Sequence, residues 1–343
     1  MMATESGWRE TGIYNWRFEK PSFYLPMRIL LVKTSSLGDV IHNLPVVSDI
    51  RRQFPGIVVD WCVEEGFAAI PRLHPDVEEV IPVAVRRWRK ALFSSQTWQE
   101  IATLRAQMGN FLYDAIVDTQ GLLKSALIAR LARGPVSGYA SGSAREPFAA
   151  RFYDRRFAVA SSEHAVVRNR KLAAAALGYP VEGKPDYGIT APAVRFDWLA
   201  PAHYLVFLTA TSRDDKLWPE ALWTVLGQRL QALGYRVVLP GGSAVERERA
   251  GRLAAAIPEA IAAPPMSITE LASLLAGAQA AVGVDTGLSH LAVALKTPAV
   301  AIFTATDPGL TGVLGEGFYR NLGGRAQVPM PDAVLEALQP VLC

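Results

Sequence analysis

Short apolar runs alternate with amphipathic segments along most of the chain, and this alternation constrains the fold more than any other feature. The runs are rich in Val, Ile and Leu, as buried strands of parallel sheets are. Such alternation favours an α/β fold with parallel sheets. The predicted strands are residues 29–32, 57–63, 80–83, 114–118, 136–139, 156–159, 204–208, 236–239, 280–284 and 299–304. The predicted helices are residues 40–54, 97–108, 122–131, 164–177, 219–233, 245–256, 268–276, 288–295 and 331–342.

The alternation stops once, at residues 178–201, where four prolines occur without a sustained hydrophobic period. The chain has 343 residues, enough for two domains. We therefore expect two Rossmann-like halves that face each other across a cleft. The expected divisions are a leader (1–26), a first domain (27–185), a linker (186–200), a second domain (201–330) and a C-terminal helix (331–343) that packs back on the first domain.

The leader is polar and aromatic and lacks the apolar segment of a signal peptide, so we expect it to be disordered. The chain contains two cysteines, Cys62 and Cys343, which makes a disulfide framework improbable. No uninterrupted apolar run reaches the roughly 18 residues of a membrane-spanning helix. These features predict a cytoplasmic protein.

Positive charge is concentrated in the first half of the chain. Residues 81–171 contain 15 Lys and Arg against six Asp and Glu, although the net charge of the whole chain is only +3. Such a basic region suggests a phosphorylated lipid, a membrane surface or a nucleic acid as partner, and the alternative is a set of solvated helix faces. No helix-turn-helix, RRM or zinc-finger pattern accompanies it, so no nucleic-acid partner is expected.

The first candidate site follows the first predicted strand, in residues 28–45 (RILLVKTSSLGDVIHNLP). A turn of small polar residues leads to Gly38 and then to Asp39, in the expected first helical turn. This order places Asp39 at the carboxyl edge of a sheet, where open α/β folds bind ligands. The turn matches neither the dinucleotide pattern G-x-G-x-x-G nor a P-loop.

Three strand ends in the second half carry groups suited to a nucleotide. Residues 209–219 (TATSRDDKLWP) offer hydroxyls and cations for phosphate oxygens, and residues 284–290 (VDTGLSH) offer free N–H groups at a helix start for a diphosphate. Residues 240–246 (PGGSAVE) let a ligand approach the backbone, and Glu246 can accept hydrogen bonds from ribose hydroxyls. The structural alternatives are exposed ion pairs in 213–216, a helix cap at Asp285 and a packed His290.

Several chemistries lack their sequence signals. There is no H-E-x-x-H, no C-x-x-C and no Cys/His cluster at metal-ligand spacing, so we expect neither a metal site nor a cofactor. No G-x-S-x-G motif supports an esterase.

Four motifs, in order, resemble those of the lipopolysaccharide heptosyltransferases: residues 32–40 (VKTSSLGDV), 113–125 (YDAIVDTQGLLKS), 213–219 (RDDKLWP) and 284–290 (VDTGLSH). Residues 81–91 (IPVAVRRWRKA) resemble the heptosyltransferase I group, which adds the first heptose, more than heptosyltransferase II. The resemblance covers residues 27–340. It implies a GT-B fold and an inverting transfer from ADP-L-glycero-β-D-manno-heptose to Kdo-lipid A at the cytoplasmic face of the inner membrane.

The resemblance also implies roles for individual residues. Asp39 matches the proposed catalytic base, and Lys216 matches the cation on the donor phosphates. The implied donor-binding residues of the second domain are Thr211, Ser212, Lys216, Glu246, Met266, Asp285, Thr286, Gly287 and His290. The candidate acceptor contacts of the first domain are Arg86, Arg87, Arg89 and Arg145. The basic first half would receive the anionic acceptor and touch the membrane.

Three alternatives stay open. The first is that the chain resembles heptosyltransferase II or III, which act on an already heptosylated core. A second alternative is an NAD-dependent oxidoreductase or epimerase on two Rossmann domains, against which the missing G-x-G-x-x-G counts. A third is a non-catalytic protein that binds a nucleotide sugar or a lipid.

Overall fold

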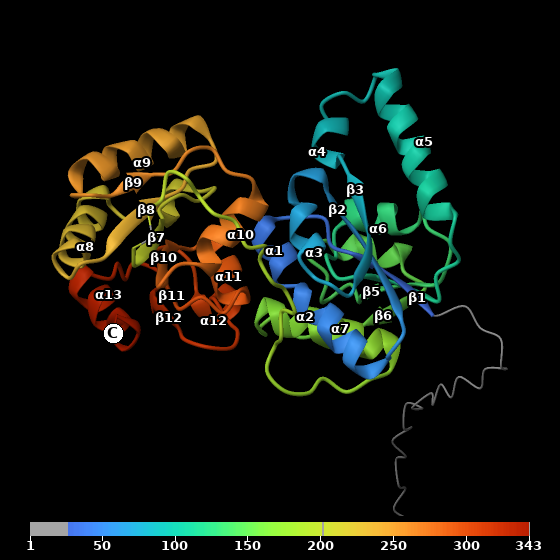
Figure 1. Ribbon diagram of the computed structural model, residues 1–343. Coiled ribbons are helices and arrows are strands. Elements are labelled where there is room, and N and C mark those ends of the chain that lie inside the picture. Colours follow the sequence, from blue (N-terminus) through green and yellow to red (C-terminus); the bar gives the residue numbers. More distant parts are fainter. Residues whose placement is uncertain (1–26, 201, 343) are drawn as a thin grey trace, which may run out of the picture.

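Two α/β domains lie side by side in the computed structural model, which describes residues 27–200 and 202–342 (Figure 1). The first domain is built on a six-stranded parallel sheet. Its strands, in spatial order, are β3 (Val77–Val83), β2 (Val58–Glu64), β1 (Arg28–Val32), β4 (Ala115–Asp118), β5 (Val136–Tyr139) and β6 (Arg155–Phe157). Pro82 lies in β3, at the edge of the sheet, where a missing N–H donor is tolerated.

The second domain repeats this architecture with another six-stranded parallel sheet. Its strands, in spatial order, are β12 (Tyr319–Gly323), β11 (Ala299–Phe303), β10 (Ala280–Val284), β7 (Tyr204–Leu208), β8 (Arg236–Leu239) and β9 (Ile261–Ala262). The central strands β7, β10 and β11 are buried along their whole length, as their continuous apolar runs predict.

The order of strands reverses once in each sheet. In the first sheet the reversal lies between β1 and β4, and in the second between β7 and β10. Ligands of open α/β sheets bind outside the carboxyl ends of the strands at such a point. The loops after β1, β4, β7 and β10 therefore form the expected functional edge of each domain, and the predicted α/β fold of two Rossmann-like domains is confirmed.

Helices connect successive strands and cover the sheets. In the first domain they are α1 (Leu37–Ile41), α2 (Leu44–Gln53), α3 (Ala69–Arg72), α4 (Val85–Trp88), α5 (Ser95–Gly109), α6 (Leu123–Ala129) and α7 (Ala165–Leu177), with 3₁₀ turns η1 (Glu65–Phe67) and η2 (Pro147–Phe152). In the second domain they are α8 (Glu220–Ala232), α9 (Ala244–Ala256), α10 (Ile268–Ala276), α11 (Gly287–Ala294), α12 (Pro308–Thr311) and α13 (Pro331–Leu338), with 3₁₀ turns η3 (Asp214–Lys216) and η4 (Gln339–Val341).

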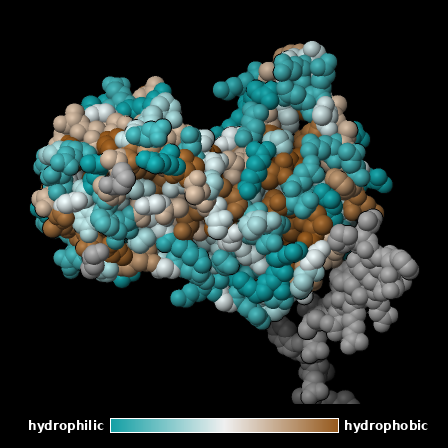
Figure 2. Space-filling view, in the orientation of Figure 1, coloured by the Kyte–Doolittle hydropathy of each residue, from teal (hydrophilic) through white to brown (hydrophobic). Residues whose placement is uncertain are grey.

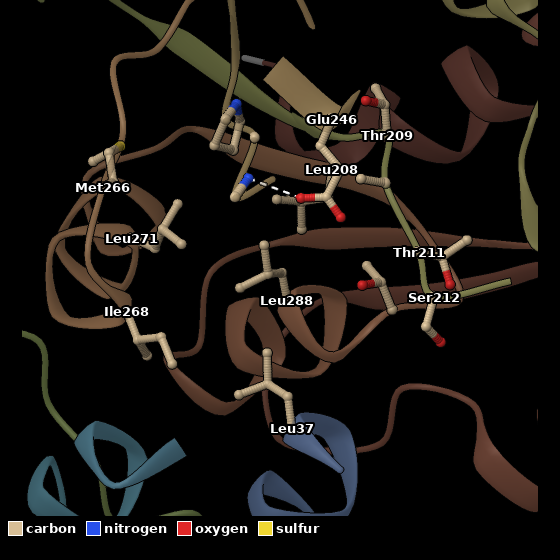
Figure 3. A pocket seen from close by; sticks show the side chains of 15 residues that line it. Leu37, Leu208, Thr209, Thr211, Ser212, Glu246, Met266, Ile268, Leu271 and Leu288 are labelled. Atoms are coloured by element: carbon tan, nitrogen blue, oxygen red, sulfur yellow. Dashed lines mark hydrogen bonds between the residues drawn. The ribbon is translucent and has the colours of Figure 1, made fainter. Parts of the chain in front are cut away.

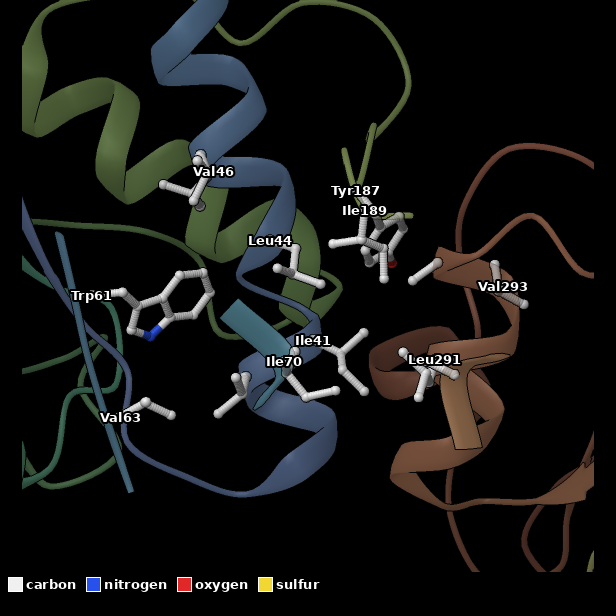
Figure 4. Packing of buried hydrophobic residues seen from close by; sticks show 14 of the residues in the cluster. Ile41, Leu44, Val46, Trp61, Val63, Ile70, Tyr187, Ile189, Leu291 and Val293 are labelled. Atoms are coloured by element: carbon white, nitrogen blue, oxygen red, sulfur yellow. The ribbon is translucent and has the colours of Figure 1, made fainter. Parts of the chain in front are cut away.

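The two domains share one hydrophobic cluster, centred where α1 packs against α11. Ile41 and Leu44 of the first domain face Leu291 and Val293 of the second, and Tyr187 and Ile189 lie beside them (Figure 4). On the face seen in Figure 2 a notch separates the two lobes above this contact. The functional edges of both sheets thus meet at a contact made by α1 and α11.

Local departures from the predicted elements have simple causes. The predicted helix at 40–54 is two helices, because α1 ends at Ile41 and α2 begins at Leu44, which puts Pro45 near a helix start, where a missing N–H is tolerated. The edge strands β9 and β12 were not predicted. They are short or only half-buried, so neither shows a continuous apolar run.

The prediction that the C-terminal helix packs on the first domain is wrong. Instead α13 packs against α8 and β11 of the second domain, and Val334 and Leu338 join the hydrophobic cluster around Trp223. Few residues separate α13 from β12, so its apolar face is covered by its own sheet. The predicted leader lies outside the described residues.

Candidate active site

Asp39 lies at the first sheet's reversal point, in the first turn of α1. Its Oδ2 accepts hydrogen bonds from the backbone N of Ser36 at 2.9 Å and from the Ser36 hydroxyl at 3.1 Å, which closes a capping box. The guanidinium of Arg145 pairs with the same carboxylate, with N–O distances of 3.3 and 3.4 Å. The structure therefore brings together two predicted residues, Asp39 and Arg145, from distant parts of the chain.

Lys33 lies beneath this carboxylate. Its ammonium is buried and donates to the backbone oxygen of Thr119 at 2.8 Å and to Asn169 Oδ1 at 3.3 Å. Burial acts to raise the pKa of Asp39, but the charges of Lys33 and Arg145 and the hydrogen bonds from Ser36 outweigh it and leave that pKa below its usual value. Asp39 is thus ionised at neutral pH.

Two residues that were not predicted as site residues, Gln120 in the loop after β4 and Lys124 in α6, support the loop that carries Asp39. The side-chain oxygen of Gln120 accepts from the backbone N of Thr34 at 2.6 Å. Lys124 donates from α6 to the Ser35 hydroxyl at 2.9 Å. Both residues belong to the motif at 113–125. The polar run directly after a buried strand could have identified Gln120, whereas Lys124 follows two leucines and carries no such signal.

A cavity of about 260 Å³ opens at the second sheet's reversal point, between the ends of β7 and β8 and the starts of α10 and α11 (Figure 3). Five predicted donor-binding residues line it: Thr211, Ser212, Glu246, Met266 and Thr286. Leu208, Ile268, Leu271 and Leu288 give it apolar walls, and Leu37 of α1 closes it from the first domain. Apolar walls with a few convergent polar groups suit a nucleoside.

Glu246 presents one oxygen to this cavity while the other holds the loop after β8. Its Oε2 accepts from the backbone N of Gly242 and of Ser243, both at 2.8 Å, and the Ser243 hydroxyl accepts from Glu246 N at 3.2 Å. A Cβ on Gly241 would lie 2.7 Å from the backbone N of Arg247. Glycine therefore allows this turn to lie against the start of α9, where it positions Glu246.

Lys216 and Asp285 form an ion pair beside the cavity, with Nζ 2.7 Å from Oδ2. Thr306 donates to the same oxygen at 2.6 Å, and Thr211 donates to the backbone oxygen of Asp285 at 2.9 Å. Asp285 is not the cap of α11, since Thr286 occupies that position. It holds the ammonium of Lys216 close to the first turn of α11, whose N–H groups point out of the helix.

The role predicted for Lys216, a cation on the donor phosphates, leads us to expect that Lys216→Met lowers kcat for sugar transfer about a hundredfold, because the charge that would stabilise a departing diphosphate is removed. Steady-state kinetics with saturating donor measures the effect. The matched control is Arg213→Met in the same loop, because Arg213 is exposed and pairs with Asp215. Equal losses in both variants would contradict a specific role for Lys216.

His290 and Gly287 do not line the cavity but form the domain contact. His290 is buried, and its Nδ1 lies 3.1 Å from Nε2 of His42 in the first domain. A Cβ on Gly287 would lie 2.7 Å from Leu37, so glycine here allows α1 and α11 to approach closely. His164 stands near His42, with ring centroids 5.8 Å apart, and its Nε2 donates to the backbone oxygen of Gly312 at 2.9 Å.

Because His42 and His290 are buried and His164 is partly buried, we expect the free energy of unfolding to fall at acidic pH. Burial lowers the pKa of His42, His164 and His290, and for His42 the two neighbouring rings lower it further. A histidine that is neutral when folded but has a pKa of about 6.5 when unfolded stabilises the protein above that pH, and this stability is lost as pH falls below it.

Burial lowers the pKa of His290 to about 4, so this residue alone should reduce the free energy of unfolding by about 1–2 kcal/mol between roughly pH 6.5 and 5, and His42 and His164 act in the same direction. Urea unfolding at several pH values measures it. His42→Gln should weaken the dependence, whereas His203→Gln, at an exposed position, should leave it unchanged. An unchanged slope in the His42 variant would contradict this account.

The predicted acceptor arginines fall into two groups. Arg145 reaches Asp39, whereas Arg86, Arg87 and Arg89 lie on or just after α4. Arg87 pairs with Glu65 and Glu100, so it already has carboxylate partners, while Arg86 and Arg89 are exposed. Arg170 of α7 is buried in an ion pair with Asp49, so it is not available to an anionic ligand.

Two absences concern only the part of the chain that the structure describes. Within residues 27–200 and 202–342, no three His, Cys, Asp or Glu side chains are grouped so that they could hold a metal ion. None of the helices in these ranges has the length and apolar character needed to cross a bilayer.

Known proteins share both the sequence and the architecture. The model of glycosyltransferase family 9 (heptosyltransferase) matches residues 101–330. Lipopolysaccharide heptosyltransferase 1 of Pseudomonas aeruginosa is 51% identical, over 84% of this chain and 82% of its own, and that of Salmonella typhimurium is 47% identical, over 84% and 92%. A solved structure titled "E. coli heptosyltransferase WaaC with ADP" superposes with a TM-score of 0.84 at 44% identity, covering 92% of this chain and 100% of that one.

Relatives named heptosyltransferase 2 or 3 are much less similar. A heptosyltransferase 3 of Escherichia coli is 24% identical and a heptosyltransferase 2 of Salmonella typhimurium 23% identical. The sequence thus groups with type 1 enzymes rather than with the second or third type. The matched motifs, the paired sheets and these similarities lead to one conclusion: this chain belongs to glycosyltransferase family 9, the heptosyltransferases, and is a transferase enzyme with the GT-B fold.

Proposed function

We propose that the chain transfers L-glycero-D-manno-heptose from ADP-L-glycero-β-D-manno-heptose to Kdo of Kdo-lipid A, with inversion, at the cytoplasmic face of the inner membrane. One observation carries this proposal. Leu37 lines the nucleotide-sized cavity of the second domain, and Asp39 follows it within the same turn of α1. The heptose of a donor whose nucleotide occupies this cavity would therefore lie close to the Asp39 carboxylate.

The donor half of the reaction uses the cavity and the ion pair beside it. The adenosine fits between the apolar walls, with its ribose hydroxyls at Glu246. Lys216 and the N–H groups of the first turn of α11 meet the charge that grows on the departing diphosphate. A relative's solved structure titled "E. coli heptosyltransferase WaaC with ADP-2-deoxy-2-fluoro heptose" has a TM-score of 0.81 with this chain, which supports this donor.

In the acceptor half, Asp39 takes the proton of a Kdo hydroxyl as that oxygen attacks the anomeric carbon from the face opposite ADP. Its lowered pKa makes Asp39 a weak base while Arg145 is paired with it. The side chain of Arg145 is 54% exposed and can turn to a carboxylate or phosphate of the acceptor. Asp39 then loses a neighbouring positive charge, so acceptor binding raises its basicity.

Replacing Arg145 with alanine is expected to move the acidic limb of the pH–kcat/KM profile to higher pH. Arg145 lowers the pKa of Asp39, whereas burial raises it. Without Arg145 the pKa of Asp39 therefore rises, and the acidic limb moves to higher pH. Arg145→Lys keeps a positive charge and should keep the limb near its original pH. A limb that does not move in the alanine variant would contradict the coupling.

The decisive experiment measures ADP release from ADP-heptose with two acceptors, Kdo-lipid A and its heptosylated product. Release with Kdo-lipid A alone is the expected result. Release only with the heptosylated acceptor would make the chain a type 2 or 3 enzyme, and donor binding without release would leave it a non-catalytic binding protein.

A further inference from the structure

The connection between α4 and α5 exposes large apolar side chains at the outer end of the first domain. Leu92 is 52% exposed, Trp98 60% and Phe93 fully exposed. In Figure 1 the α4 and α5 ribbons rise above the rest of the first domain, with this connection at the upper end. We call residues 89–98 the tip.

The tip is held in one shape by its own hydrogen bonds. Lys90 N donates to Arg87 O and Ser94 N to Ala91 O, both at 3.0 Å, and the Trp98 indole donates to Leu92 O at 2.9 Å. Below it, the buried Trp88 donates to Glu100 at 2.7 Å, and Arg87 joins Glu100 to Glu65. The inward groups are thus partnered, and the apolar side chains are presented by a preformed support.

Exposed cations directly precede these apolar groups in the chain. Arg86, Arg89 and Lys90 are exposed, while the nearby carboxylate of Glu100 is already paired with Arg87. An aromatic and aliphatic centre with a rim of cations complements an anionic lipid surface, where rings enter the interface and cations meet headgroups. Among the described residues neither Arg89 nor Lys90 forms an ion pair with a carboxylate, so both cations beside the fully exposed Phe93 are available to lipid phosphates.

Positive charge also continues from the tip toward Asp39. Burial lowers the pKa of Lys124, the Glu64 carboxylate opposes this, and the charges of Arg86 and Arg89 lower the pKa further, so both arginines act on that ammonium. Lys124 in turn donates to Ser35, in the loop that leads to Asp39. A lipid acceptor whose acyl chains stay in the bilayer would meet these cations with its anionic headgroup before its sugar reaches Asp39.

We propose that the tip is the membrane-docking element of this enzyme, with Leu92, Phe93 and Trp98 entering the headgroup region of an anionic bilayer and Arg89 and Lys90 binding its lipid phosphates. This inference rests on the proposed function only in taking the acceptor to be a lipid embedded in that bilayer.

The test is co-sedimentation of the full chain with vesicles of equal parts zwitterionic and anionic phospholipid, without acceptor or donor. We expect the wild type to bind, and the Leu92→Ser/Phe93→Ser variant to lose at least about tenfold in partitioning. The control is Leu233→Ser, because Leu233 is 58% exposed in the second domain. Lys90→Glu should lose about fivefold, whereas Lys184→Glu, at another exposed lysine, should bind as the wild type.

Two further measurements keep the outcomes distinct. Brominated acyl chains should quench wild-type fluorescence more than that of Trp98→Phe, which reports entry of this indole into the bilayer. Transfer to a water-soluble Kdo acceptor without acyl chains should be equal in the wild type and the Leu92→Ser/Phe93→Ser variant, which also shows that the variant folds. Vesicle binding without any transfer would overturn the proposed function alone. Absence of wild-type binding, or equal binding by the double variant, would overturn the docking role.

Discussion

Replacing Asp39 with asparagine is expected to lower kcat for heptose transfer by about 10²- to 10⁴-fold, the usual contribution of a general base. The amide keeps the size of the side chain, and its oxygen can still accept from Ser36 in the capping box. The fold and the donor cavity should therefore be unchanged. Single-turnover transfer together with calorimetric titration of ADP-heptose measures both quantities.

The control for this variant is Ser36→Ala. It removes one hydrogen bond to the Asp39 carboxylate but leaves the carboxylate and the backbone donor of residue 36 in place. Its kcat should fall far less than that of Asp39→Asn. Near-normal turnover by the asparagine variant would show that Asp39 only orients the acceptor hydroxyl.

Replacing Arg170 with methionine is expected to lower the free energy of unfolding by about 3–5 kcal/mol, because the buried Asp49 carboxylate loses its buried partner and keeps only the longer pair with the exposed Arg52. Arg170 and Asp49 are each 4% exposed, and their N–O distances are 2.6 and 3.0 Å. Arg170 also donates to the backbone oxygens of Glu182 and Gly183, so it joins α7 to α2 and to the segment between the domains. The loss is a large share of the roughly 5–15 kcal/mol that stabilises a typical domain.

The chain supplies a matched control in Arg52, which pairs with the same carboxylate at 3.4 Å but is 47% exposed. Solvent screens that pair, so Arg52→Met should change stability by at most about 1 kcal/mol. Urea unfolding of both variants, with wild-type protein alongside, measures the difference. Similar losses at the two positions would contradict the assignment of the stability to burial.

The candidate site residues that follow directly after a strand were predictable from the sequence. Asp39 and Thr286 both follow buried apolar runs, and the reversal of strand order brings such loops to one edge. Glu246 was predictable as a polar residue after a glycine turn. Its second role, in the capping box of α9, was not predicted, although Ser243 and Glu246 have the spacing of that motif. Lys33 was not assigned a role, because no local pattern shows that a lysine after a strand will be buried beneath a carboxylate.

The sequence by itself determined the alternating strands and helices, their division into two halves and the turns that carry polar groups. These depend on hydrophobic periodicity and on Gly and Pro, which act within a few residues. The tertiary structure alone decided which distant groups meet. Arg145 reaches Asp39 across 106 positions, His290 reaches His42 across 248, and α13 covers its own sheet. Such contacts depend on how whole helices and sheets pack, and packing leaves no periodic signal in the chain.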